Sequence, residues 1–201
     1  MTTFDDIIRV LTRHRPLLLN FPSHTRAAVA LVLRAGTCGL DMLFIERAFR
    51  ASDPWSGDLG FPGGKVEEGE SDPRLTAERE TLEEIGLDLR GSHYLGRLSD
   101  ITGAHMPVLV SCFVYGVADH PPFVLSHELR DAFWIPIADL TSQESHVMAT
   151  VRFTGKILVR PAIRLPQTSK PVLWGITYRL VMEFLKLFGE ATDRCLLGKS
   201  S

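Results

Sequence analysis

The segment from residue 52 to residue 86 constrains the fold of this chain more than any other. Its first half is dense in glycine and proline and runs through a Phe-Pro-Gly-Gly stretch. Asp72 then offers a helix N-cap with Pro73 at the first helical position, and Gly86 offers a left-handed helix end. These signals predict a helix over residues 73–85 behind a long loop, and a loop of this length in a compact domain is usually functional.

The predicted helix has two chemically different faces. With Glu80 as the origin and an advance of about 100° per residue, Glu83 falls at about 300° and Glu84 at about 40°. Three carboxylates therefore share one face. Three large apolar residues lie between about 140° and 220° on the same count: Leu75, Leu82 and Ile85. We expect the side that carries these apolar residues to face the core.

The clustered carboxylates need a compensating charge, because like charges at these spacings destabilise a helix by roughly a few tenths of a kcal/mol per pair. A solvated surface face is one interpretation. Two features favour a binding site instead: the cluster directly follows the glycine-rich loop, and Arg79 can form an ion pair with Glu83 four residues later. An oxygen-only cluster of this kind suits Mg²⁺ or Mn²⁺.

The rest of the chain alternates between strand-like and helix-like segments. Thr3 can cap a first helix that ends before Pro16. The other predicted elements are a β-hairpin at 27–33 and 40–46, strands at 94–99, 108–117 and 132–135, a short helix at 136–140, a hairpin at 151–153 and 157–159, and an amphipathic helix at 172–188. One central helix between groups of strands predicts an α+β fold.

Charge and cysteine content restrict the partners and the compartment. A formal net charge of -2 gives no long-range attraction to nucleic acid or to an anionic membrane. Asp5 and Asp6 are unlike the basic start of a signal peptide, and no segment approaches the roughly 18 to 20 apolar residues of a membrane span. Cys38, Cys112 and Cys195 have no paired spacing. We expect a cytoplasmic protein with reduced thiols and no nucleic-acid or membrane partner, and a homodimer is left open.

The segment 64–87 resembles the Nudix box. Gly64 is followed after five residues by Glu70, and after eight more by Arg79-Glu80-Thr81-Leu82-Glu83-Glu84-Ile85-Gly86-Leu87. The gap before Arg79 is one residue longer than is usual in that family, and Thr81 stands where an aliphatic residue is common. The resemblance implies a Nudix-type α/β/α sandwich with a mixed central β-sheet and one catalytic loop-helix over residues 25–188. Residues 1–24 would form an N-terminal helical extension and residues 189–201 a C-terminal tail.

The resemblance also assigns roles position by position. Glu80, Glu83 and Glu84 would bind the metal, with the backbone carbonyl of Gly64 as a further ligand. Arg79 would orient a carboxylate. The implied reaction is hydrolysis of a diphosphate linkage by a water that Mg²⁺ or Mn²⁺ activates, with a glutamate as general base.

Two glutamates compete for the role of general base. Glu83 is the first candidate and Glu128 the second, with an ordinary loop acid as the alternative interpretation of Glu128. His105 and His127 are expected to be surface or packing residues, because carboxylates already supply the metal ligands.

The loop before the helix hints at the substrate. It most resembles the coenzyme A pyrophosphatase-like branch of the Nudix family, and Trp174-Gly175-Ile176-Thr177 points the same way, although Asp58 stands where histidine or glutamine is frequent. Arginine and lysine side chains in and after the loop could contact phosphates, and an aromatic ring could stack on a base. The candidate substrate-binding residues are Arg47, Arg50, Phe61 and Lys65, with solvated loop cations and loop packing as the alternatives.

Three hypotheses about function follow. The first is hydrolysis of a small-molecule nucleoside diphosphate derivative, with coenzyme A or acyl-CoA as the substrate. The second keeps the chemistry and changes the substrate to a nucleotide sugar, a dinucleotide or a nucleoside triphosphate. The third is a non-catalytic Nudix-fold sensor, which the three retained carboxylates Glu80, Glu83 and Glu84 disfavour.

Overall fold

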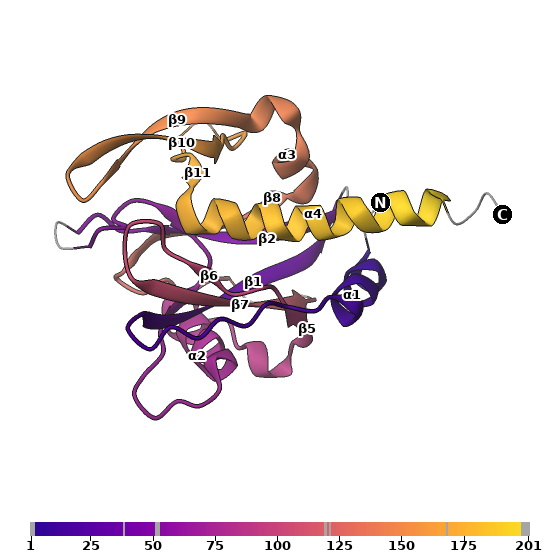
Figure 1. Cartoon of the computed structure of the whole chain (residues 1–201), viewed down its shortest axis with the longest axis horizontal. Helices are drawn as coiled ribbons and strands as arrows, with labels where there is room; N and C mark the ends of the chain where they lie inside the picture. Colours follow the sequence, from indigo (N-terminus) through magenta and orange to yellow (C-terminus); the bar gives the residue numbers. More distant parts are fainter. Residues whose placement is uncertain are drawn as a thin grey trace.

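Figure 1 shows a computed structural model of the chain, which describes residues 3–37, 39–50, 53–118, 120, 122–167 and 169–197. Cys38, Ser52 and the side chain of Cys195 lie outside the described residues, so the predictions that concern them stay predictions. Cys112 is a free and buried thiol.

The elements follow one another in the mixed order that the sequence predicts. The helices are α1 (Phe4–Arg13), α2 (Pro73–Ile85), α3 (Ile137–Thr141) and α4 (Gly175–Leu197), with two short 3₁₀ helices, η1 (Leu89–Gly91) and η2 (Gln143–Ser145). The strands are β1 (Thr25–Gly36), β2 (Gly39–Arg47), β3 (Leu59–Gly60), β4 (Gly63–Lys65), β5 (His93–Arg97), β6 (Ile101–Thr102), β7 (Val108–Val117), β8 (Leu129–Pro136), β9 (His146–Phe153), β10 (Lys156–Ile163) and β11 (Leu173–Trp174).

The main sheet is built around β1. This strand pairs antiparallel with β2 and parallel with β7, and the sheet runs in the order β3-β2-β1-β7-β5. The strands β4, β6 and β8 pair with β1, β7 and β2 respectively, and β11-β10-β9 form a second, smaller sheet. One parallel pair among antiparallel pairs makes the central sheet mixed, which confirms the predicted fold class.

The alternation of side chains along β1 explains why helices cover both faces of the sheet. Ala28, Ala30 and Val32 belong to the buried cluster that also contains side chains of α2. Leu31 and Leu33 belong to the cluster that contains side chains of α1 and α4. Figure 1 shows α2 on one side of the sheet and α1 and α4 on the other, which is an α/β/α sandwich.

The first helix is tied into this core. Thr3 and Asp6 form a capping box, in which each side chain accepts a hydrogen bond from the backbone of the other. Ile7 and Leu11 are buried in the main core cluster. Gly96 lies so close to Leu11 that an added Cβ would stand 2.9 Å from the Leu11 side chain. The predicted domain division at residue 25 stays a prediction, but α1 packs on the same core as the sheet.

The helix α2 has the predicted bounds. The Asp72 side chain accepts a hydrogen bond from the backbone N–H of Arg74 at 3.0 Å, and Pro73 takes the first helical position. Gly86 ends the helix with φ of 72°, a left-handed conformation that glycine adopts without the penalty of a Cβ. Local cap signals therefore decide both ends of this helix.

The predicted core side of α2 is wrong for two of its three residues. Leu75 is 52% exposed and Leu82 is 41% exposed, whereas Ile85 is fully buried. The residues that the helix buries are Thr76, Ala77, Thr81, Glu84 and Ile85. Ala77 and Ile85 share one buried cluster with Ala28 and Ala30 of β1, so the helix packs on the sheet with a face that apolar periodicity does not mark.

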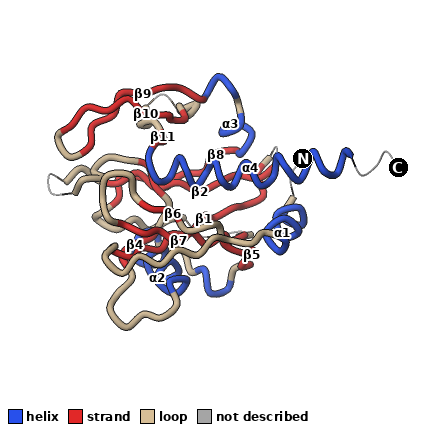
Figure 2. The backbone as a smooth tube through the Cα atoms, viewed as in Figure 1, coloured by secondary structure: helices blue, strands red, loops and turns tan. Residues whose placement is uncertain are grey.

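Other boundaries differ because long-range strand pairing decides them. The chain before the closing helix forms β11, with Leu173 and Trp174 opposite Ile163 and Ala162 of β10, so α4 begins at Gly175 instead of residue 172. The predicted loop from residue 52 to residue 69 contains the short strands β3 and β4. Figure 2 shows the chain between β4 and α2 as an extended loop.

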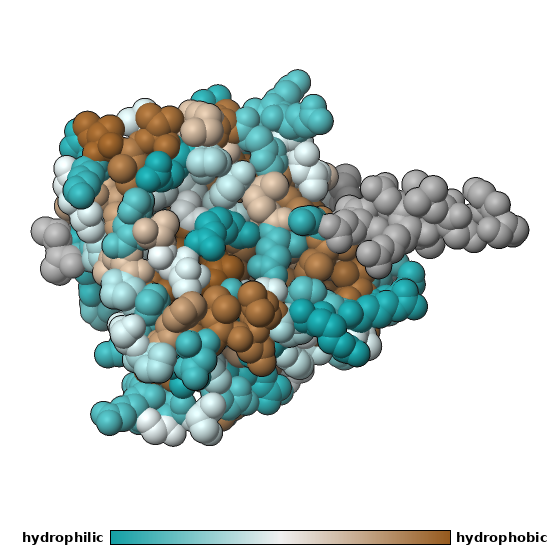
Figure 3. Space-filling model, viewed as in Figure 1, coloured by the Kyte–Doolittle hydropathy of each residue, from teal (hydrophilic) through white to brown (hydrophobic). Residues whose placement is uncertain are grey.

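The β9–β10 hairpin is longer than predicted. Its turn lies at Thr154 and Gly155, which have φ of 48° and 76°. Met148, Ile157 and Val159 are exposed on it, and Figure 3 shows apolar surface over this hairpin at the upper left. Among the described residues, no helix combines the length and the apolar character that crossing a membrane requires.

Candidate active site

Two glycines bring the loop against the sheet and against α2. The strand β4 pairs with β1, with Gly63 opposite Val29 and Gly64 opposite Ala28. Gly63 has φ of 153°, and an added Cβ would lie 2.3 Å from the backbone oxygen of Ala28. An added Cβ on Gly64 would lie 2.4 Å from the carboxyl group of Glu80. The absence of a side chain at residue 64 thus lets the Glu80 carboxylate reach the loop backbone.

Arg79 connects the acidic residues of α2 with the preceding loop. Its Nη1 donates hydrogen bonds to Glu80 at 2.9 Å and to Glu83 at 3.2 Å, so the ion pair expected from the i+4 spacing is present. Its Nε donates to Glu70 at 3.4 Å. Burial alone would lower the pKa of Arg79, but the hydrogen bonds and charges of Glu70 and Glu80 raise it above its usual value, so the guanidinium stays charged.

Glu84 lies on the buried side of α2. Its Oε2 accepts a hydrogen bond from the backbone N–H of Gly63 at 2.9 Å, and its Oε1 lies 3.9 Å from Nη1 of Arg47. Burial raises the pKa of Glu84 to about 7, although the Gly63 N–H and the Arg47 charge both favour the ionised form. A desolvated carboxylate of this kind gains from a nearby cation.

Glu80 and Glu83 differ in exposure. Burial raises the pKa of Glu80, and the neighbouring charges of Glu83 and Glu128 raise it further, while Arg79 opposes the shift. The Glu83 side chain is 58% exposed, so its carboxylate is open to solvent. The acidic face therefore grades from the buried Glu84 through Glu80 to the exposed Glu83.

Glu128 comes from a distant loop and lies near the same carboxylates. Its negative charge raises the pKa of both Glu80 and Glu84. Nη1 of Arg50 donates to Glu128 at 3.2 Å, and the backbone N–H of Ser126 donates to the Glu84 carbonyl at 2.8 Å. The structure thus brings the second candidate base to the site that the first candidate occupies.

Comparison with known proteins decides the family. The family model described as NUDIX domain matches residues 23–154, which is more than half of the chain. The chain belongs to the NUDIX domain family.

Curated relatives agree with that family. This NUDIX chain is 31% identical to the human mitochondrial coenzyme A diphosphatase NUDT8, over 66% of the chain and 59% of the relative. It is 26% identical to the probable nudix hydrolase C6G9.05 of Schizosaccharomyces pombe, over 92% of the chain and 65% of the relative. An uncharacterized S. pombe protein is 32% identical over 77% of the chain and 59% of its own length. The chain thus spans less than two thirds of the length of these relatives.

Solved structures support the NUDIX fold. The NUDIX domain of Shewanella oneidensis NrtR, crystallised with ADP ribose, superposes with a TM-score of 0.51 at 16% identity over 93% of this chain and 97% of that chain. A MutT/nudix family protein from Enterococcus faecalis gives a TM-score of 0.53 at 14% identity over 96% of this chain and 70% of that chain. At such identities the likeness shows the fold alone.

The predicted metal ligands of the NUDIX box lie on one face of the fold but are not drawn together. Among the described residues, no group of three Asp, Glu, His or Cys side chains is arranged to hold an ion, because Arg79 holds Glu80 and Glu83 and Gly63 holds Glu84. The donor set nevertheless fits a hard divalent cation. It consists of carboxylates, and burial raises the pKa of two of them, Glu80 and Glu84. The Glu80 carboxyl group also lies against the backbone of Gly64.

The predicted substrate-binding residues have different surroundings. Phe61 is buried and stacks on Phe44 with ring centroids 5.4 Å apart, so it does not fit the predicted role of stacking on a base. Lys65 is exposed and has no hydrogen bond or ion pair within the described part of the chain. Arg47 holds Asp53 through Nε and Nη2, each at 2.9 Å from the same oxygen.

Sequence reasoning missed two contacts near the site. Nε1 of Trp174 donates to the Asp58 carboxylate at 2.8 Å, and burial raises the pKa of Asp58 to about 6. Glu46 is buried and accepts hydrogen bonds from Arg130 and Lys170. The partners in these contacts are far apart in the chain, and no local spacing indicates that they meet. His105 is exposed, with its ring 6.1 Å from that of Phe153 and its Nε2 3.0 Å from Nη2 of Arg160.

Proposed function

We propose that this chain hydrolyses the diphosphate linkage of a nucleoside diphosphate derivative, with coenzyme A or acyl-CoA as its substrate. The observation that carries the proposal is the arrangement of the three box carboxylates on α2, with Gly64 against Glu80 and Arg79 between Glu80 and Glu83. The coenzyme A diphosphatase name of the human relative supports this substrate.

The chain's own residues divide the work at the diphosphate. Glu80, Glu83 and Glu84 would hold Mg²⁺ or Mn²⁺ together with the Gly64 carbonyl, after the Arg79 contacts rearrange. A bound divalent ion supplies charge neutralisation at the phosphate oxygens and lowers the pKa of the attacking water. Arg79 fixes the orientation of the carboxylates that it contacts.

The general base is Glu83 in this proposal. Each candidate carboxylate accepts one arginine hydrogen bond at 3.2 Å, Glu83 from Arg79 and Glu128 from Arg50, and the Glu83 side chain is the more exposed of the two, at 58% against 42%. Glu128 remains the second candidate because its charge is close enough to act on Glu80 and Glu84. Replacing each by glutamine separates the two roles, since the loss of the base lowers kcat by about 100-fold or more and the loss of a neighbouring acid does not.

A substrate panel tests the proposal. Coenzyme A, acetyl-CoA, ADP-ribose, a diadenosine polyphosphate and a nucleoside triphosphate are incubated with Mg²⁺ or Mn²⁺, with and without chelator, and the products are identified by mass. We expect 4′-phosphopantetheine and adenosine 3′,5′-bisphosphate from coenzyme A, with no turnover in chelator. Rapid cleavage of another diphosphate without cleavage of coenzyme A would overturn the proposed substrate but support the proposed diphosphate hydrolysis. The cytoplasmic location and the homodimer stay predictions, and three relatives are named as mitochondrial.

A further inference from the structure

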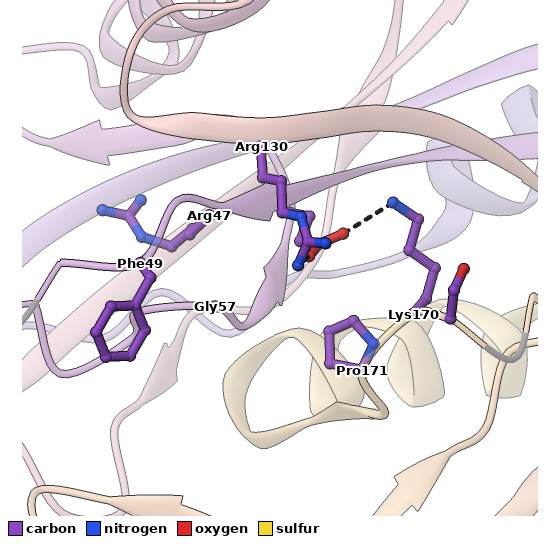
Figure 4. A pocket seen from close by; sticks show the side chains of 8 residues that line it. Arg47, Phe49, Gly57, Arg130, Lys170 and Pro171 are labelled. Atoms are coloured by element: carbon purple, nitrogen blue, oxygen red, sulfur yellow. Dashed lines mark hydrogen bonds and ion pairs between the residues drawn. The ribbon is translucent and has the colours of Figure 1, made fainter.

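A pocket of about 390 Å³ lies beside the candidate active site. Its walls come from the end of β2, the loop before β3, the start of β8 and the segment before β11. The residues that line it are Glu46, Arg47, Phe49, Gly57, Arg130, Ser169, Lys170 and Pro171. Figure 4 shows Arg130 and Lys170 toward one end of the pocket and Phe49 and Arg47 toward the other.

The lining of this pocket is positively charged. Glu46 is buried and accepts hydrogen bonds from Nη1 of Arg130 at 3.0 Å and from Nζ of Lys170 at 2.8 Å. Three cations, Arg47, Arg130 and Lys170, thus line the pocket together with one carboxylate. Two carboxylates outside the lining also pair with these cations, Asp53 with Arg47 and Asp131 with Lys170. Arg130 is therefore the cation whose donors are most open to an entering anion.

Two side chains of the pocket have unused binding capacity. The Arg130 side chain is 73% exposed, and one of its five N–H groups is used in a hydrogen bond within the described part of the chain. The remaining donors suit the bidentate geometry of a phosphate. Phe49 is 85% exposed, so its ring is free to stack on a nucleobase.

Arg47 joins this pocket to the carboxylates of α2. It lines the pocket, and its Nη1 lies 3.9 Å from the Glu84 carboxylate. A ligand bound with a diphosphate at the α2 carboxylates can therefore extend past Arg47 into the pocket.

We propose that this pocket binds a phosphomonoester that the substrate carries in addition to its diphosphate, with Arg130 and Lys170 on the phosphate and Phe49 on the adjoining base. The inference rests on the proposed function for the identity of the diphosphate arm. It adds a criterion for selecting substrates, since a nucleotide with a separate phosphomonoester is bound in preference to the same nucleotide without it.

Binding without metal tests the pocket independently of turnover. Adenosine 3′,5′-bisphosphate and AMP are titrated into the full chain by calorimetry in the presence of chelator. We expect the bisphosphate to bind about tenfold or more tightly than AMP, and Arg130→Gln to remove most of this preference. Arg90→Gln is the matched control, because Arg90 is similarly exposed at 71% and also pairs with one carboxylate, that of Asp88. It should leave the preference unchanged.

A second variant keeps the test decisive if Arg130→Gln does not fold. Phe49→Ala removes an exposed ring. It should lower the affinity for both adenosine 3′,5′-bisphosphate and AMP by a similar factor of about three to ten, because stacking on the base is common to both ligands. Equal affinity for the two ligands in the wild-type chain would overturn the inference, and so would a preference that Arg130→Gln and Lys170→Gln leave intact.

Kinetics separate this inference from the proposed function. The ratio of kcat/KM for coenzyme A over dephospho-coenzyme A should be about tenfold or more in the wild-type chain and close to one in Arg130→Gln. If coenzyme A is not hydrolysed but the chain still binds adenosine 3′,5′-bisphosphate more tightly than AMP, and Arg130 is needed for this preference, the pocket proposal is supported and the proposed function is wrong. If coenzyme A is hydrolysed but the chain binds the two ligands equally well, the proposed function is supported and the pocket proposal is wrong.

Discussion

At the scale of single residues, Gly63 and Gly64 have different reasons to be glycine. An added Cβ on Gly63 would meet the backbone of β1, which cannot move, at a φ of 153°. An added Cβ on Gly64 would meet the end of the Glu80 side chain, which can move. Glycine at residue 63 therefore serves backbone geometry and stability, and glycine at residue 64 leaves room for the Glu80 carboxylate.

This difference predicts that substitution of Gly63 mainly lowers stability, whereas substitution of Gly64 mainly lowers activity. Gly63→Ala should lower the free energy of unfolding by about 1 to 3 kcal/mol or more, the usual cost of a strained backbone. Gly64→Ala should cost less than about 1 kcal/mol of stability but lower kcat by about tenfold or more, since it displaces Glu80. Chemical denaturation and steady-state kinetics on both variants check this. Equal losses of stability would show that Gly63 and Gly64 are not glycine for different reasons.

Asp58 makes stability depend on pH. Burial raises its pKa from 3.8 to about 6, so the folded chain binds more protons than the unfolded chain between these values. Stability contributed by the protonated form is therefore present below about pH 4 and lost as pH rises through about 6. Asp58→Asn keeps an oxygen for the Trp174 N–H and removes the titration.

We expect Asp58→Asn to be more stable than the wild-type chain near neutral pH, by no more than about 3 kcal/mol at about 1.4 kcal/mol per pKa unit. The difference should shrink towards pH 4.5. Urea unfolding of both chains at about pH 4.5 and about pH 7.5 measures it. A difference that is the same at both pH values would show that Asp58 does not titrate in this range.

At the scale of elements, α2 shows which features local sequence can predict. Its ends were predictable because Asp72, Pro73 and Gly86 act on their own neighbours. The Arg79–Glu83 pair was predictable for the same reason. Its packing face was not, because the sheet surface that it meets is lined with small residues and accepts Ala77 and threonines in place of leucines.

The packing face of α2 can be tested by truncating its apolar side chains one at a time. Ile85→Ala should cost about 2 to 5 kcal/mol, the usual range for a buried isoleucine, because Ile85 is fully buried. Leu82→Ala should cost less than about 1 kcal/mol because Leu82 is 41% exposed. Thermal and urea unfolding give both values. Equal costs would favour the face that apolar periodicity predicts over the face seen in the structure.

At the scale of the whole molecule, contacts between distant segments decide what sequence reasoning could not. The parallel pairing of β1 with β7 places Thr25 opposite Val108, and no local signal specifies this register. The pocket beside the active site brings Lys170 to Glu46. By contrast, the Arg79–Glu83 pair and the order of elements depend on neighbours in the chain and were predicted from them.

The packing of α1 predicts that the first 24 residues are needed for a stable fold. Ile7 and Leu11 are buried in the main core cluster, and burial of each contributes about 1.5 to 3 kcal/mol. Deletion of residues 1–24 should therefore lower the free energy of unfolding by roughly 3 to 6 kcal/mol or more. Denaturation of the shortened chain measures this. Unchanged stability would show that these residues form an independent extension.

In the proposed function, the carboxylates of α2 carry a metal-dependent diphosphate hydrolysis. The most direct measurement is the initial rate of coenzyme A cleavage with Mg²⁺ by the wild-type chain, Glu80→Gln, Glu83→Gln and the control Glu144→Gln, whose glutamate is exposed on η2. We expect a rate that chelator abolishes, losses of about 100-fold or more for the two α2 variants, and an unchanged rate for the control. Wild-type rates in folded Glu80→Gln and Glu83→Gln would contradict it.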